Sequence, residues 1–207
     1  MFYKSIEIMI ESELTEKKSR FICVLSPAVN MEEAEAILAN VRRRYPAATH
    51  YCYAWRIRSE GMVMEKYSDD GEPSSTAGIP MLNVLKMQEI ENVIAVVVRY
   101  FGGTLLGTGG LVRAYSHAVI QTLEQAGPII MEYSRHLRIT LDYNYYSNFQ
   151  NKCLGYLIKL NNAEFADQVT IDCWVTETQL EALINTLDKI TDRTAVLENV
   201  EQDFVAG

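Results

Sequence analysis

Two short segments gather most of the residues that could do chemistry. One of them reads SDDGEPSSTAG, and its acidic loop supplies Asp69, Asp70, Glu72 and Thr76. Carboxylates in one tight loop could bind a hard cation, or could pair with arginines elsewhere in the chain. The loop is also ordinary turn sequence, and Thr76 or Ser75 is an ordinary N-cap for a following helix. Its spacing differs from an EF-hand, so we predict no metal site and keep the turn-and-cap and ion-pair interpretations open.

The second segment is a glycine loop between a β-branched run and a helical pattern. Its five glycines lie within nine positions and are Gly102, Gly103, Gly107, Gly109 and Gly110. Glycine backbone can take positive φ and point N–H groups at a ligand, and the following helix adds unpaired N–H groups. With Arg99 and Arg113 on either side, the loop predicts an anion-binding or partner-binding site. His117 shares a helical face with Arg113 and joins this site. The alternative is a tight turn that only packs the helix against its strand.

Several familiar active sites do not fit the sequence. The chain has no GxxxxGK[ST] loop, and Val112 stands where GxGxxG needs its last glycine, so we exclude an ATPase and a Rossmann enzyme. Ser74 or Ser75 lacks the GxSxG elbow that would make a nucleophile of it. The four cysteines form no CxxC pair and are predicted to be buried free thiols; they are Cys23, Cys52, Cys153 and Cys173. No cofactor is predicted.

Composition and charge restrict the class of protein. The 207 residues are 48% hydrophobic and carry a net charge of −8, which is unevenly placed. Residues 1–130 hold 13 Lys/Arg against 15 Asp/Glu, whereas residues 131–207 hold 6 against 12. This balance argues against loose, charge-driven binding to DNA or to anionic membrane, although a basic patch on the first half stays open. The N-terminus does not read as a secretory signal, and the longest apolar run, 93–98, is too short to span a bilayer, so we predict a cytoplasmic protein.

The elements that must position the two segments follow from hydrophobic periodicity and turn residues. In chain order we predict strands at 3–11 and 20–25, a helix at 31–45, strands at 50–57 and 62–67, a helix at 79–88, a strand at 92–101 and a helix at 111–127. Residues 11–19 are predicted to be a charged turn, and the second hairpin turns at Ser59-Glu60-Gly61. Tyr51, Tyr53 and Trp55 share one face of their strand, which predicts core packing or, alternatively, a base-stacking surface.

Gly127 and Pro128 close the last of these helices, and the pattern restarts at about Met131. It predicts a strand at 135–143, a helix at 145–160, two strands within 162–175, a helix at 177–190 and a strand at 195–201. This is a βαββαβ order, the ferredoxin-like plan. We therefore predict an α+β protein of two domains, 1–131 and 132–207.

The segments ATHYCYAWRI, YSDDGEPSSTAGIPML and VVVRYFGGTLLGTGGLVRAYSHA, preceded by KSRFI, resemble the IMPACT/YigZ family. The resemblance covers about residues 1–128, and the rest is similar to the smaller domain of the bacterial, YigZ-type members. It implies an N-terminal domain with a ribosomal-protein domain 2-like fold, shared with domain IV of elongation factor G. It also implies a C-terminal domain similar to domain V of that factor, and it points to translation.

The family's dense motif is matched residue by residue. It falls on Asp69, Asp70, Gly71, Glu72, Pro73, Thr76, Ala77, Gly78, Arg99, Tyr100, Phe101, Gly102, Gly103, Gly107, Gly109, Gly110, Arg113 and Tyr115. Two positions depart from the family pattern. Ser75 stands where members often have glycine, and Leu105 stands where they often have lysine, which removes a cation from the expected site.

The leading hypothesis is a non-enzymatic regulatory protein that binds structured RNA, the ribosome or a translation-associated protein through residues 69–78 and 99–115. The rival is an enzyme for a small phosphate or carboxylate substrate. In it Arg99 and Arg113 would hold the anion, and Asp70 or Glu72 would act as acid or base. A third interpretation is an adaptor that uses the acidic C-terminal domain. The sequence names neither partner nor oligomeric state.

Overall fold

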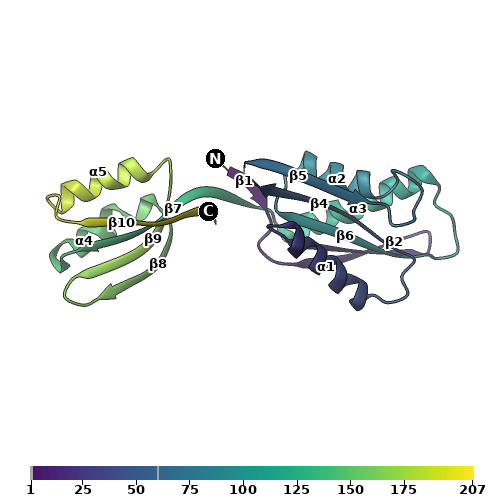
Figure 1. The fold of residues 1–207 in the computed structure, drawn as a ribbon, viewed down its shortest axis with the longest axis horizontal. Helices are drawn as coiled ribbons and strands as arrows, with labels where there is room; N and C mark the ends of the chain where they lie inside the picture. Colours follow the sequence, from purple (N-terminus) through teal and green to yellow (C-terminus); the bar gives the residue numbers. More distant parts are fainter. Residues whose placement is uncertain (1, 60) are drawn as a thin grey trace. The chain divides into compact units, whose positions relative to one another are not determined.

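The computed structural model describes residues 2–59 and 61–207, which form two compact units (Figure 1). One unit takes Tyr3–Ile129, and the other takes Ile130–Gly207 together with Phe2. Glu60, in the predicted hairpin turn, lies outside the described residues. The chain is a mixed α+β protein, as predicted, and each unit is described by itself.

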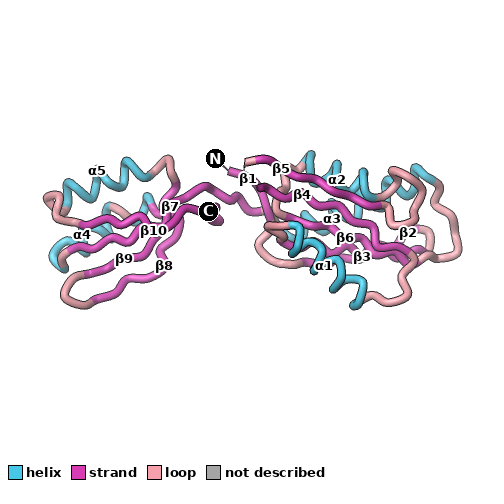
Figure 2. Tube along the Cα trace, in the orientation of Figure 1, coloured by secondary structure: helices cyan, strands magenta, loops and turns pink. Residues whose placement is uncertain are grey.

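The first unit is a five-stranded sheet with helices on both faces (Figure 2). β1 (Phe2–Ser5) comes first in the chain and belongs to the other five-stranded sheet. The elements of the first unit's sheet and its helices are β2 (Ile10–Glu16), β3 (Ser19–Pro27), α1 (Met31–Arg44), β4 (His50–Ser59), β5 (Met62–Ser68), α2 (Gly78–Met87), β6 (Val93–Tyr100) and α3 (Thr108–Ala126). The strand order is β2-β3-β6-β4-β5, and every neighbouring pair is antiparallel. The β-branched run of β6 occupies the centre because it is buried on both faces.

Two cores lie on opposite faces of this sheet. On one face α2 and α3 pack over alternate residues of the strands, among them Phe21, Cys52 and Val97. On the other face α1 packs over the intervening residues, among them Trp55 and Val96. The aromatic stripe of β4 therefore belongs to the α1 core, which confirms core packing and removes the base-stacking alternative.

The first predicted strand and turn were wrong in their bounds. β1 ends at Ser5, and β2 runs from Ile10 to Glu16 where a charged turn was expected. The ladder with β3 pairs every residue from Ile10 opposite Leu25 to Glu16 opposite Ser19. The prediction failed because β2 is an edge strand, which exposes alternate charged residues to water and therefore resembles a charged turn in sequence. Only Lys17 and Lys18 remain as the turn.

The second unit is a ferredoxin-like domain. Its elements are β7 (Ile129–Leu141), α4 (Tyr143–Lys152), a short 3-10 helix η1 (Leu154–Tyr156), β8 (Leu157–Phe165), β9 (Val169–Thr176), α5 (Leu180–Ile190) and β10 (Val196–Ala206). The strands of the βαββαβ order lie as β10-β7-β9-β8, all neighbours antiparallel. Phe149 of α4 and Leu183 and Leu187 of α5 cover one face. The predicted plan is confirmed.

The predicted helix at 145–160 was too long. α4 stops at Lys152, Cys153 caps it, and β8 begins at Leu157. Leu157 instead lies opposite Val175 of β9 and packs on the core of this unit. Tertiary pairing thus overrides an apolar pattern that fits either a helix or a strand over so short a run.

The four cysteines are free and buried, as predicted. Burial raises the pKa of the Cys23 and Cys52 thiols to about 12, so both stay protonated near neutral pH. Over the described part of the chain, no helix combines the length and apolar character needed to cross a bilayer.

Candidate functional site

Asp69 is the cap of α2. Its Oδ1 accepts hydrogen bonds from the backbone N–H groups of Ala77 and Gly78, at 2.9 and 2.8 Å. Its Oδ2 accepts from the N–H of Ser75 at 2.8 Å. The prediction that Thr76 or Ser75 caps the helix was wrong. The side chain that binds the N–H groups of Ala77 and Gly78 is Asp69, which lies eight and nine residues before them in the sequence. Thr76 instead donates its hydroxyl to the carbonyl of Pro73 at 2.6 Å.

Asp70 is also held by its neighbours. Its Oδ1 accepts from the guanidinium of Arg42, and its Oδ2 from the N–H of Tyr51, at 2.8 and 2.7 Å. Its carbonyl oxygen lies 2.8 Å from Nδ1 of His50, and a carbonyl only accepts, so that nitrogen carries a proton. The carboxylate of Asp70 therefore fastens the loop to β4 and α1, and it does not meet Arg99 or Arg113.

Glu72 and Arg99 form a buried ion pair. Oε1 of Glu72 accepts from Nη1 of Arg99 and, at 2.8 Å, from the hydroxyl of Tyr115. The two charged side chains are 3% and 6% exposed. Nε2 of His50 lies 3.9 Å from the other carboxylate oxygen. The ion-pair interpretation of the acidic loop is thus confirmed for Glu72 and Arg99.

Arg99 is enclosed and does not face solvent as an anion site would require. Its guanidinium lies over the rings of Phe21 and Phe101, at 5.3 and 5.6 Å, and Nη2 donates to Ser19 Oγ at 3.3 Å. We expected Arg99 to hold an anion, but its charge is already matched by Glu72. Burial and the neighbouring Glu72 carboxylate raise the pKa of Tyr115, so its hydroxyl stays a donor within this cluster. We call Glu72, Arg99 and Tyr115 the buried triad.

Gly102 brings the glycine loop against the β2–β3 turn. A Cβ built on it would lie 2.0 Å from the carbonyl carbon and oxygen of Lys18. Its N–H donates to Ser19 Oγ at 3.2 Å, the same hydroxyl that contacts Arg99. Only glycine fits this approach, which supports the packing interpretation at this position.

The other glycines of the loop serve its shape and the start of α3. Gly103 and Gly107 have φ of 82° and 73°, a region that favours glycine. Gly109 lies under the side chain of Arg113, since a Cβ there would be 3.6 Å from Nη1, and Gly110 packs on Leu106. Arg113 thus reaches back over the first turn of α3.

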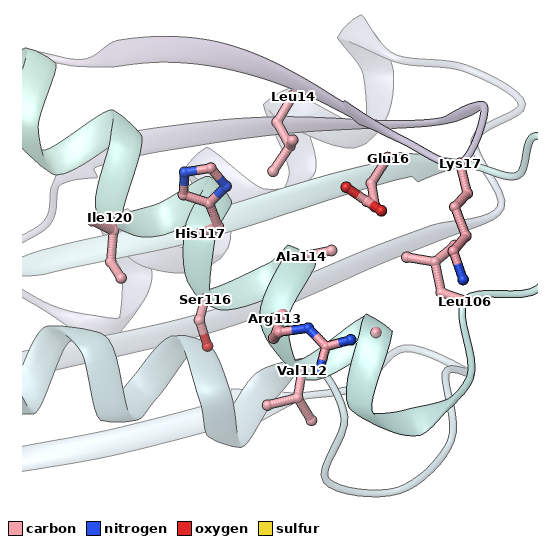
Figure 3. Close-up of a pocket in the computed structure, with 11 residues that line it drawn as sticks. Leu14, Glu16, Lys17, Leu106, Val112, Arg113, Ala114, Ser116, His117 and Ile120 are labelled. Atoms are coloured by element: carbon pink, nitrogen blue, oxygen red, sulfur yellow. The ribbon is translucent and has the colours of Figure 1, made fainter.

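A groove lies between α3 and the end of β2 (Figure 3). It encloses about 490 Å³. We call it the α3 groove and define it by Leu14, Glu16, Lys17, Leu106, Gly110, Val112, Arg113, Ala114, Ser116, His117 and Ile120. Among residues 2–59 and 61–207, the side chains of Lys17, Arg113 and His117 form no ion pair or hydrogen bond. Of the predicted site residues, Gly110, Arg113 and His117 meet here.

Among the described residues, the side-chain hydrogen bonds between β2 and α3 lie at Ser12 and Glu13, and the groove lies beside the end of β2 that follows them. Ser12 Oγ and Thr122 Oγ1 form a buried hydrogen bond of 2.6 Å between the two elements. Alternation along β2 places Leu14 and Glu16 on the same face as Ser12, toward α3. Leu14 packs on the core, and Glu16, at the end of the strand, lines the groove.

Lys17 enters the groove from a strained turn. Lys17 and Lys18 have φ of 46° and 68° and form a two-residue hairpin loop between the paired residues Glu16 and Ser19. Positive φ at both positions is a type I′ turn, which Asn-Gly normally occupies. Sequence reasoning missed Lys17 and Glu16. The two-residue hairpin loop could have identified them, but the charged residues before it were interpreted as part of a longer turn.

Metal ligation finds no support in the described part of the chain, where no group of three or more His, Cys, Asp or Glu side chains could hold an ion. The carboxylates of Asp69, Asp70 and Glu72 point to different partners, as the contacts above show.

The chain belongs to the IMPACT family. The model of the Impact N-terminal domain matches residues 17–123, and that of a domain of unknown function, DUF1949, matches residues 139–192. These matches cover the sheet with both segments and the ferredoxin-like unit.

One curated relative and one solved structure match along nearly the whole chain, and a second relative matches along half of it. The IMPACT family member YvyE of Bacillus subtilis is 32% identical over 203 residues, covering 98% of this chain and 93% of its own. The family member YigZ of Escherichia coli is 48% identical over 110 residues, or 53% of this chain and 54% of its own. A solved structure described as a hypothetical protein aligns with a TM-score of 0.62 at 31% identity, covering 97% of this chain and 98% of that chain.

Proposed function

We propose that this chain is a non-enzymatic protein of the translation apparatus that binds structured RNA of the ribosome through the α3 groove. One observation carries the proposal: Lys17 and Arg113 are exposed cations that line one groove with His117 and form no ion pair among the described residues. Free cations beside the first turn of a helix attract phosphate groups. Family membership, and the similarity to elongation factor domains that the sequence implies, direct the proposal to the ribosome and the cytoplasm.

The fate of the other charged residues supports binding over catalysis. Arg99 is matched by Glu72, and Asp70 is fastened to Arg42. An enzyme of the rival kind would need Asp70 or Glu72 beside a cation that holds the substrate. Both carboxylates face partners within the fold, and neither pairs with Arg113, which forms no ion pair in the described part of the chain.

The test is co-sedimentation with ribosomes at two salt concentrations. The variant Lys17→Glu/Arg113→Glu reverses both groove cations. Its matched control is Arg43→Glu/Lys66→Glu, which makes the same charge change on the α1 side of the sheet, where Lys66 pairs with Glu35. We expect wild-type binding to fall with salt, the control to bind like wild type, and the groove variant to lose binding. Each cation that contacts a phosphate should contribute about one unit to the salt slope.

Two results would overturn the proposal. If the wild-type protein fails to sediment at the lower salt concentration, the ribosome is not its partner. If the groove variant sediments as well as the control, the α3 groove is not the contact, and a protein partner or the second unit carries the binding.

A further inference from the structure

We propose that the α3 groove takes a single unpaired nucleotide of the RNA, and that Glu16 selects its base by accepting a hydrogen bond from an exocyclic amino group. This inference rests on the proposed function and makes it more specific. The inference states which part of an RNA enters the groove, whereas the proposed function states that the RNA belongs to the ribosome.

The volume and the apolar lining of the groove fit a single base better than they fit the backbone of a duplex. Its volume of about 490 Å³ lies in the range of small-ligand sites. Much of the lining is apolar and comes from Leu14, Leu106, Val112, Ala114 and Ile120. A phosphate backbone needs cations at the surface but no apolar hollow. An unstacked base has apolar faces that such a hollow can cover.

The cations stand where the phosphate of that nucleotide would lie. Figure 3 shows Lys17 and Arg113 near Leu106, at the glycine-loop end of the groove, and His117 further along α3. Lys17 and Arg113 would hold the phosphate beside the first turn of α3. His117 offers an aromatic ring further along α3, where a base could stack on it.

Glu16 is the residue that a simple anion site does not explain. It is the one acidic side chain of the groove lining, and a carboxylate beside Lys17 and Arg113 weakens their attraction for phosphate. Within the described ranges it forms no ion pair or hydrogen bond, so it does not hold the fold together. Figure 3 places its carboxylate between Lys17 and His117, facing the groove. We therefore assign Glu16 a role in binding the nucleotide that enters the groove.

An ionised carboxylate only accepts hydrogen bonds. It can therefore pair with the exocyclic amino group of adenine, cytosine or guanine. Uracil carries carbonyl oxygens on both sides of its N3–H, and these repel the carboxylate. The chemistry of Glu16 thus favours adenine, cytosine or guanine over uracil at this position.

The experiment titrates the full chain into labelled hexanucleotides rA6, rC6 and rU6 and follows fluorescence anisotropy. Wild-type protein should bind rA6 or rC6 about tenfold more tightly than rU6, the lower end of discrimination by a base-edge hydrogen bond. Glu16→Gln should bring this preference to within about twofold, because glutamine also donates, to uracil O4. Glu11→Gln is the control, since it makes the same charge change on the opposite face of β2.

The outcomes separate this inference from the proposed function. Equal binding of all three hexanucleotides by wild type would overturn the inference, and so would a Glu16→Gln variant that gains affinity for each of them equally. Ribosome binding that depends on Lys17 and Arg113, without any hexanucleotide binding, would also overturn it and leave the proposed function standing. A base preference that Glu16→Gln removes, without ribosome binding, would uphold the inference and refute the proposed function.

Discussion

The buried triad and the α3 groove contain the same kinds of residue and use them in opposite ways. In the triad, Arg99 and Glu72 are enclosed, and each neutralises the charge of the other. In the groove, Arg113 and Glu16 are exposed and have no partner among the described residues. Both sets lie within or beside the glycine loop and the segments that carry the family resemblance.

The difference indicates that a dense motif can be used for packing, because the charged side chains of the triad are paired inside the fold. The triad takes Glu72 and Arg99 from the predicted site, and their contacts fix the acidic loop to β6 and α3. The groove joins the predicted residues Gly110, Arg113 and His117 to Glu16 and Lys17, which the sequence did not single out. The charged side chains among them have no ion-pair partner in the described part of the chain, which leaves them available. Four variants can test this division, and they are ordered by the size of the expected effect.

The largest effect should come from Glu72→Ala. It leaves the guanidinium of Arg99 buried without a countercharge, which destabilises a fold by about 3–5 kcal/mol. Urea unfolding of the full chain measures the loss. Glu11→Ala is the control, because Glu11 pairs with Arg44 at the surface, where such pairs contribute about 0–1 kcal/mol. A loss for Glu72→Ala as small as that of the control would mean that the triad does not hold the fold.

Gly102→Ala should have the next largest effect. Its methyl group would lie 2.0 Å from the backbone of Lys18, so the glycine loop and the β2–β3 turn must separate. Overpacking of this kind costs about 1–3 kcal/mol. Thermal unfolding would show it, with Gly155→Ala as control, since no atom lies within 4 Å of a Cβ there. Equal melting temperatures of the two variants would contradict the close approach.

Replacing Lys17 with Asn and Lys18 with Gly should separate stability from binding. Both lysines have positive φ, and relief of left-handed strain is worth about 1–2 kcal/mol per residue, offset in part by the flexibility that glycine adds to the unfolded chain. The double variant should melt at a higher temperature and sediment less with ribosomes. Lys66→Asn should change neither property. Unchanged ribosome binding in a stabilised protein would remove Lys17 from the binding site.

The smallest effect belongs to Ser75→Gly. Ser75 has φ of 62°, and its N–H bond to Asp69 survives the change because it uses only backbone. The substitution should stabilise the chain by up to about 1 kcal/mol. Ser74→Gly, at a position outside the left-handed region, should give no gain. A lower melting temperature for Ser75→Gly would show that the serine side chain has a use of its own.

Much of the fold follows from sequence because its signals are local. The β-branched run of β6 and the alternation of β4 each predict an element and its faces, and the structure agrees. Ser75, where family members often have glycine, has a positive φ, so the family pattern indicates the backbone conformation at this position. The misses arise where a distant strand decides, as at β2 and β8, whose bounds are set by their pairing with β3 and β9.

The site is harder to predict because exposure is a tertiary property. Arg99 and Arg113 flank the same loop, and nothing in the sequence says that Phe21 and Glu72 will enclose one of them. Lys17 escaped prediction for the complementary reason. Its value depends on α3, which lies almost a hundred residues further along the chain and forms the other wall of the groove.

The cap that Asp69 makes on α2 also bears on the order of folding. Its bonds to the N–H groups of Ser75, Ala77 and Gly78 close loops of at most ten residues. A loop of about ten residues closes in about 10–100 ns, far faster than distant strands can pair. We expect the acidic loop to be formed before β6 docks. Arg99 would then pair with Glu72 in a loop that is already formed, and β6 would pack against this loop when the sheet forms.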